Sequence, residues 1–168
     1  TQNCIDLLVA YIVNTMHYLN LWISVVRFFA VTSFLSMWMS NTATTAMMIP
    51  IAIALVDKTY PRMRTMIILG TAYSANIGGN GTAVGSPPNG LAVSALDIDF
   101  FTWFKVGFPT ALVMFPLVII ALWLMIKPEK DAKVNRLSDH NSMKWSSEAK
   151  RTIALFLFTG ICWIFSSQ

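Results

Sequence analysis

Three long stretches without a charged side chain are the strongest constraint on how this chain can fold. Residues 28–56, 65–96 and 106–126 contain no Asp, Glu, Lys or Arg. A helix needs about 20 residues to cross the hydrocarbon core of a bilayer, so each stretch is long enough. Charged residues make up only 12% of the whole chain and the mean hydropathy is +0.59, whereas an ordinary soluble domain has about 25% charged residues. The sequence therefore predicts an all-α integral membrane protein.

The positive charges indicate which side of the membrane one segment faces. Seven of the 12 Lys and Arg residues lie in residues 127–151, a polar segment between two apolar ones. Basic residues gather in cytoplasmic loops of membrane proteins, so we predict a cytoplasmic loop here. A nucleic-acid-binding domain would instead carry its basic residues as a patch on a polar surface. The sequence therefore predicts no nucleic-acid partner.

The two ends of the sequence predict a piece of a longer protein. Residues 1–27 mix apolar residues with Asp6, Asn14 and His17, which predicts a helix or an interfacial segment. They show no cationic start, no cleavage pattern and no initial Met, so we expect an internal segment and no signal peptide. Residues 152–165 are an apolar run of 14 residues, too short to cross a bilayer. We expect residues 152–168 to be the start of a truncated transmembrane helix.

Residues 106–126 form the most regular of the uncharged stretches. A helix of this length would rise about 32 Å, which matches a hydrocarbon core of about 30 Å. Pro109 and Pro116 lie inside it, and membrane helices tolerate such prolines as kinks when neighbouring helices satisfy the freed carbonyl groups. We predict one transmembrane helix.

The stretch 28–56 is interrupted in its middle by polar residues. Ser40, Asn41 and Thr42 separate two apolar arms, and each arm would rise only about 18 Å as a helix, well short of the hydrocarbon core. This pattern predicts a re-entrant helical hairpin with a polar tip. Ser36 and Ser40 are four residues apart, so we expect both hydroxyls on one face of the first arm.

The stretch 65–96 is interrupted by glycine and proline. Five of the eight glycines of the chain lie in residues 76–90, together with Pro87 and Pro88. A continuous helix would lose about 1 kcal/mol for each Gly and about 3 for each interior Pro, so we predict a broken transmembrane helix, unwound over residues 78–89. The basic residues near 58–64 and the acidic pair Asp97 and Asp99 place the start of this broken helix on the cytoplasmic side and its end outside. The helix at residues 106–126 is then expected to cross back to the cytoplasmic side.

Two interrupted membrane segments are typical of a secondary transporter, in which substrate and ions bind at the broken ends. Ser, Thr and Asn side chains and unwound carbonyl groups offer the neutral oxygens that suit Na⁺, and the His, Cys and carboxylate ligands of a transition-metal site are missing. The start of the second hairpin arm, near residues 42–45, offers free backbone N–H groups to an anion. Neither interruption contains Lys or Arg. We therefore expect bound sodium to supply the positive charge for an anionic substrate, with no other cofactor.

Two segments carry a resemblance to a known family. SMWMSNTATTAMMIP (36–50) and GTAYSANIGGNGTAVGSPPN (70–89) resemble the first-repeat motifs of the divalent anion:sodium symporter family, the di- and tricarboxylate transporters. The resemblance implies an inverted-repeat, elevator-type transporter, dimeric in its full-length form, that imports succinate-, malate- or citrate-like anions across the plasma membrane, or the inner membrane in a bacterium. The family carries a second Ser-Asn-Thr motif in its other repeat, and this chain has none, so the resemblance implies a first-repeat fragment with half of the binding site.

The resemblance also implies roles for individual residues in the two motifs. The implied sodium-binding residues are Ser36, Ser40, Asn41, Thr82, Gly85 through its backbone, and Asn89. The implied substrate-binding residues are Ser40, Asn41, Thr42 and Pro88.

Other readings of the same residues stay open. Within the transporter class these are a sulfate transporter, a sodium-independent exchanger and an arsenite or ion permease of related architecture. Ser and Thr in membrane helices also serve as packing residues that bond their own backbone, which would suit a structural or assembly subunit. A membrane-embedded hydrolase using Ser40 or Ser86 would need a His or Lys beside it, and the three uncharged stretches contain neither. We therefore expect a protein that is not an enzyme.

Overall fold

The computed structural model describes residues 21–129, 131–132, 151, 154 and 158. Within that part of the chain all regular structure is helical and there is no strand, which confirms the all-α prediction. The helices are α2 (Leu21–Ser36), α3 (Asn41–Leu55), α4 (Pro61–Asn80), α5 (Pro87–Leu96) and α6 (Phe100–Ile126). Most of the predicted segments 1–27, 127–151 and 152–168 lies outside the described residues.

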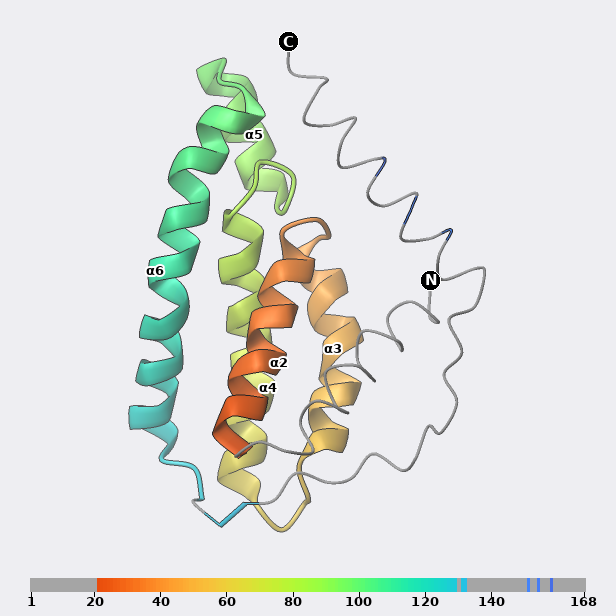
Figure 1. Cartoon of the computed structure of the whole chain (residues 1–168), viewed down its shortest axis with the longest axis vertical. Helices are drawn as coiled ribbons and strands as arrows, with labels where there is room; N and C mark the ends of the chain where they lie inside the picture. Colours follow the sequence, from red (N-terminus) through yellow and green to blue (C-terminus); the bar gives the residue numbers. More distant parts are fainter. Residues whose placement is uncertain (1–20, 130, 133–150, 152–153, 155–157, 159–168) are drawn as a thin grey trace.

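Helix α4 is the centre of the fold. It contacts α2 and α3 on one side and α6 on the other, while α2 and α3 also contact each other. Figure 1 shows α2 and α3 side by side as a hairpin, with α5 continuing beyond the break in α4 and α6 running back along the full length. The break in α4 and the turn of the hairpin are therefore both held against one central helix.

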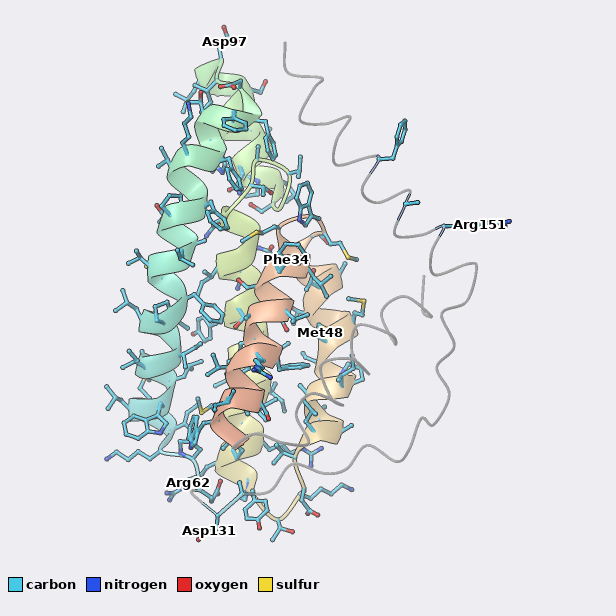
Figure 2. All side chains as sticks on the ribbon, viewed as in Figure 1. Phe34, Met48, Arg62, Asp97, Asp131 and Arg151 are labelled. Carbon is cyan, nitrogen blue, oxygen red and sulfur yellow. The ribbon has the colours of Figure 1, made fainter. Side chains whose placement is uncertain are left out.

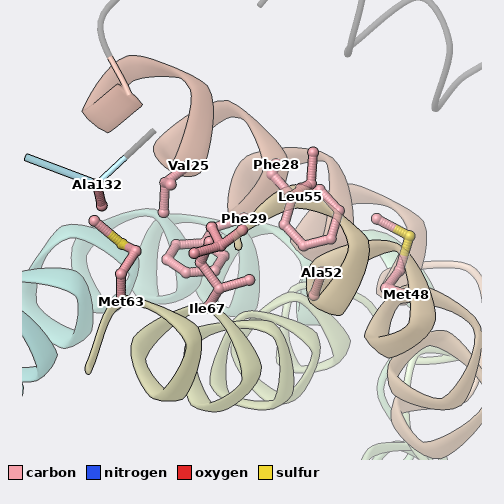
Figure 3. Packing of buried hydrophobic residues seen from close by; sticks show 10 residues of the cluster. Val25, Phe28, Phe29, Met48, Ala52, Leu55, Met63, Ile67 and Ala132 are labelled. Atoms are coloured by element: carbon pink, nitrogen blue, oxygen red, sulfur yellow. The ribbon is translucent and has the colours of Figure 1, made fainter. Parts of the chain in front are cut away.

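The apolar core lies where α2, α3 and α4 pack together, away from the break (Figure 3). The Phe29 ring is fully buried, and a Cβ added at Gly70 of α4 would lie 2.1 Å from its Cζ atom. The ring therefore fills the space that Gly70 leaves open. Helices in a bilayer associate largely through close van der Waals packing, which a small residue such as Gly allows, so this contact helps to hold the hairpin on α4.

Helix α6 has the properties of a membrane-spanning helix. Its 27 residues would rise about 40 Å, and among the described residues it is the one helix long and apolar enough to cross a membrane. It begins six residues before the predicted 106–126, because the Asp99 side chain caps it by accepting the Thr102 N–H at 3.1 Å. Lys105 is accommodated in the first turns with its ammonium group 5.6 Å from the centre of the Phe101 ring.

Two chain segments far apart in sequence meet at one end of the molecule. Figure 2 places Arg62 and Asp131 at this end and Asp97 at the opposite end. Helix α4 begins at Pro61 without a side-chain cap of its own. The carboxylate of Glu129, just after α6, instead accepts the backbone N–H groups of Arg62 at 3.1 Å and Met63 at 2.8 Å.

Removal of this carboxylate should change how stability depends on pH. Burial raises the pKa of Glu129, but backbone N–H groups of Glu129, Met63 and Arg62 outweigh it and hold the pKa below its ordinary value of 4.5. The stabilisation is therefore present above about pH 4.5 and is lost as pH falls through the lower, folded-state pKa. Between pH 6 and pH 3.5 the melting temperature of Glu129→Gln should fall less than that of the wild type. Asp131→Asn, which changes an exposed carboxylate two residues along, is the control, and an equal fall in the wild type and Glu129→Gln would contradict the capping role.

Candidate functional site

The two breaks in the helices lie against each other. Helix α2 ends at Ser36 and α3 begins at Asn41, while α4 ends at Asn80 and α5 begins at Pro87. Thr82, in the loop after α4, donates its hydroxyl hydrogen to the carbonyl oxygen of Met37 in the turn after α2. Figure 1 shows this turn beside the α4–α5 loop. Residues about 45 positions apart in sequence thus form one site.

The structure corrects two details of the predicted breaks. Ser36 and Ser40 do not share one helical face, because Ser36 is the last residue of α2 and Ser40 is the N-cap of α3. The unwound segment is shorter than the predicted 78–89, since Gly78 and Gly79 remain in α4. Their missing side chains serve close packing, because a Cβ at Gly78 would lie 1.9 Å from the Ser33 carbonyl oxygen.

Asn41, the first residue of α3, lies at the centre of the site. Ser36 donates its hydroxyl hydrogen to Asn41 Oδ1 at 2.9 Å, and Asn41 Nδ2 donates to Asn76 Oδ1 at 3.2 Å. The Asn41 atom that faces Ser36, Oδ1 in this orientation, also lies 3.2 Å from the carbonyl oxygens of Gly85 and Ala75. One side-chain amide therefore joins α2, α3, α4 and the loop after α4.

Neutral oxygens converge on the inner side of Asn41. We call the Ser36 hydroxyl and the Ala75 and Gly85 carbonyl oxygens the oxygen cluster. With Asn41 Oδ1 turned inward, this oxygen accepts the Ser36 hydroxyl hydrogen at 2.9 Å but also faces the Ala75 and Gly85 carbonyl oxygens at 3.2 Å. The two contacts between acceptor oxygens are unfavourable unless a cation lies among them. With the amide reversed, Nδ2 lies within 3.2 Å of all three members of the cluster, and its two N–H groups can donate to two of them at a time. Without a cation, hydrogen bonding therefore favours the orientation of Asn41 with Nδ2 turned toward the cluster.

Thr82 and Asn89 brace the loop that supplies Gly85. Besides contacting Met37, the Thr82 hydroxyl oxygen accepts the Gly85 N–H at 3.1 Å. The Asn89 side chain is buried, and its Nδ2 donates to the carbonyl oxygens of Gly79 at 2.8 Å and Thr82 at 2.9 Å. These contacts support a role in positioning Gly85, and the implied role of Thr82 and Asn89 as sodium ligands stays a prediction.

The residues expected to bind substrate lie at two helix starts. Ser40 is exposed, and its hydroxyl oxygen accepts the Ala43 N–H at 3.3 Å, which leaves its O–H free to donate. Thr42 lies exposed in the first turn of α3, and Pro88 lies exposed in the first turn of α5. Ser40 also lines an open cleft of about 620 Å³ with Ser86, the N-cap of α5, and Asp99. Both helix starts thus border one cleft.

Sequence reasoning missed two groups of the site on α4, the Ala75 carbonyl and the Asn76 side chain. Both lie within 3.2 Å of the Asn41 amide. The sequence did offer a signal for Asn76. It precedes Gly79 by three residues, and residues with this spacing lie on the same face of a helix. The sequence offered no signal for Ala75, because every residue type has a backbone carbonyl.

Comparison with known proteins gives one family and several relatives. Residues 4–167 match the citrate transporter family CitMHS. An uncharacterized transporter of Methanocaldococcus jannaschii is 41% identical over 136 residues, which cover 79% of this chain and 30% of that protein. An uncharacterized transporter of Haemophilus influenzae is 38% identical over 157 residues, covering 89% of this chain and 33% of that protein. The sodium-dependent dicarboxylate transporter SdcS of Staphylococcus saprophyticus is 32% identical over 163 residues, which cover 82% of this chain and 31% of that protein. The chain spans about a third of the length of these relatives.

Proposed function

The chain belongs to the citrate transporter family CitMHS, and from that membership we propose that it forms half of the binding site of a sodium-coupled transporter of di- and tricarboxylates. Members of this family and the relatives above are transporters and not enzymes. Succinate, malate and citrate are the proposed substrates, and sodium is the proposed coupling ion. The proposal extends to this chain what the name of the Staphylococcus saprophyticus relative says of that protein.

The oxygen cluster around Asn41 is the observation that carries the proposal. A hydroxyl and two backbone carbonyls surround a side-chain amide at the meeting point of two helix breaks. Hard cations prefer oxygen ligands, and none of these four groups carries a charge of its own. A bound sodium ion would therefore leave a net positive charge at the site.

That positive charge would hold the anionic substrate beside it. The N-terminus of α3 and the Ser40 hydroxyl offer donors to a carboxylate. The N-terminus of α5 offers fewer, because Pro87 and Pro88 have no N–H group. Asp99 also lines the cleft, and its carboxylate would repel an anion. Since basic side chains are missing from both motifs, the cation is the group that can offset this repulsion.

The length of α3 supports a tip at membrane depth. With 15 residues between its N-cap Ser40 and its C-cap Val56, α3 would rise only about 22 Å, so a hairpin whose second arm ends at one surface would have its tip inside the bilayer. We place the protein in the plasma membrane, or in the inner membrane of a bacterium, as a multi-pass homodimer in its full-length form. An inverted second repeat would supply the other half of the site, and an elevator-like movement of the site would carry the substrate across.

Equilibrium binding of labelled succinate to the full-length protein tests this function. Coupling between two ligands of one transporter is commonly 1–3 kcal/mol, so replacing choline by sodium should lower the Kd for succinate at least fivefold. Equal binding in choline would remove sodium from the mechanism and favour the sodium-independent exchanger. Competition by sulfate but not by malate or citrate would reassign the substrate to sulfate.

A further inference from the structure

The C-terminal end of α4 is held by side chains from two other helices. The last carbonyl groups of a helix have no N–H partner within that helix. Asn89 of α5 donates through Nδ2 to the Gly79 carbonyl oxygen at 2.8 Å. Trp103 of α6 donates its indole N–H to the next carbonyl oxygen, that of Asn80, at 3.2 Å. Two consecutive carbonyl groups at the break in α4 therefore take their hydrogen bonds from α5 and α6.

Gly107 allows α6 to approach this end of α4 closely. It lies four residues after Trp103, on the same side of α6. A Cβ at Gly107 would lie 2.6 Å from the Asn80 carbonyl oxygen and 2.9 Å from Trp103 Nε1. The hydrogen bond between the two helices therefore lies in the space that a side chain at Gly107 would need. Figure 1 shows α6 running beside the junction of α4 and α5.

The end of α4 in turn supports Gly85, whose carbonyl oxygen belongs to the oxygen cluster. A Cβ at Gly85 would lie 2.4 Å from the Gly79 carbonyl oxygen and 2.8 Å from Gly79 Cα, so the two glycines are in close backbone contact. Gly79 directly precedes Asn80, the residue that Trp103 holds. A displacement of the last residues of α4 would therefore move the Gly85 carbonyl relative to the rest of the cluster.

We propose that Trp103 is a positioning residue for the sodium site, and that α6 sets the sodium affinity of this site through the Asn80 carbonyl. The proposal rests on the proposed sodium-coupled function and extends it to a residue outside both sequence motifs. Trp103 itself contacts neither the ion nor the substrate. Its N–H fixes the end of α4, and the end of α4 fixes one oxygen of the cluster. The substrate donors at Ser40 and the start of α3 lie on another helix, so their geometry does not depend on this hydrogen bond.

Trp103→Phe in the full-length protein tests the proposal, because it keeps an aromatic ring against α4 and removes the N–H donor. Loss of one hydrogen bond commonly changes an equilibrium by about two- to tenfold. Sodium, titrated alone by calorimetry, should therefore bind at least threefold more weakly than to the wild type. Succinate, titrated in saturating sodium, should bind within twofold of the wild type. A purely structural role would weaken both ligands together.

Two variants are matched controls. Asn80→Ala removes an exposed side-chain amide but keeps the backbone carbonyl to which Trp103 donates. Trp123→Phe makes the same exchange of rings near the other end of α6, where Trp123 packs edge-on against Trp22 with 6.5 Å between ring centres. Both affinities should stay within twofold of the wild type in each control.

Gly107→Ala disturbs the same hydrogen bond from the backbone of α6, and it decides the question should Trp103→Phe not fold. It should also weaken sodium at least threefold and leave succinate binding in saturating sodium within twofold. The double variant should bind sodium no more weakly than the weaker single variant, because both changes remove one contact.

The two ligands separate failure of the inference from failure of the proposed function. Wild-type sodium affinity in Trp103→Phe, or sodium and succinate weakened together, would overturn the inference and leave the proposed function standing. Equal binding of succinate by the wild type in sodium and in choline would refute the proposed function, and the inference with it.

Discussion

Asn41→Ala should reduce sodium-driven succinate uptake by the full-length protein more than tenfold, while the amount of protein in the membrane stays near normal. The side chain contacts Ser36, Asn76 and the carbonyls of Ala75 and Gly85. Truncation removes the Asn41 amide and leaves the three members of the oxygen cluster without their common partner. Asn41 is partly exposed and is not a member of the apolar core, so the loss falls on the site and not on packing.

The measurement is the initial rate of labelled succinate uptake into proteoliposomes, divided by the amount of folded protein recovered. Asn80→Ala again supplies a control for loss of an exposed amide near the end of α4. Normal uptake by Asn41→Ala would assign Asn41 to ordinary helix packing. In that alternative, polar side chains form hydrogen bonds with neighbouring backbone groups and bind no ligand.

The positions of the breaks could be predicted from sequence because they depend on local chemistry. Ser40 is an N-cap residue and Pro87 is suited to the first position of a helix, so both mark helix starts without reference to the rest of the fold. The extent of α4 could not be predicted in the same way. Gly78 and Gly79 disfavour a helix when considered alone, but they remain helical because α2 and Asn41 pack directly against them.

Contacts between distant residues account for most of what the sequence did not reveal. The Glu129 carboxylate caps α4 from 66 residues away, and Thr82 reaches Met37 across 45 residues. No pattern of residue types specifies which backbone N–H or carbonyl a polar side chain will meet. The side chains at the centre of the site were predictable as residue types, while their partners depended on how α2, α3 and α4 pack.

Substitution by Ala should mainly lower the thermal stability of the protein at Gly78 and mainly lower transport at the neighbouring Gly79. A Cβ at Gly78 would lie 1.9 Å from the carbonyl oxygen of Ser33 and 2.6 Å from its carbonyl carbon, so α2 and α4 would have to separate. Overpacking of this kind costs about 1–3 kcal/mol or more, and we expect Gly78→Ala to lower the melting temperature by roughly 5–10 °C. Gly90→Ala, whose Cβ would meet only the Ala83 carbonyl oxygen at 3.8 Å, should melt close to the wild type.

Gly79→Ala should instead retain the fold and lose transport. Its Cβ would lie 1.9 Å from Asn41 Oδ1 and 2.8 Å from Asn41 Cγ, and these atoms are the end of a side chain that can rotate away. The melting temperature should therefore change less than in Gly78→Ala, whereas succinate uptake should fall more than tenfold, as in Asn41→Ala. The double variant Gly79→Ala with Asn41→Ala should be no less active than either single variant, because both changes remove the same amide from the oxygen cluster. Additive losses in the double variant would mean that Gly79 affects transport by a route other than Asn41, and a Gly79→Ala protein with normal uptake would place the Asn41 side chain outside the sodium site.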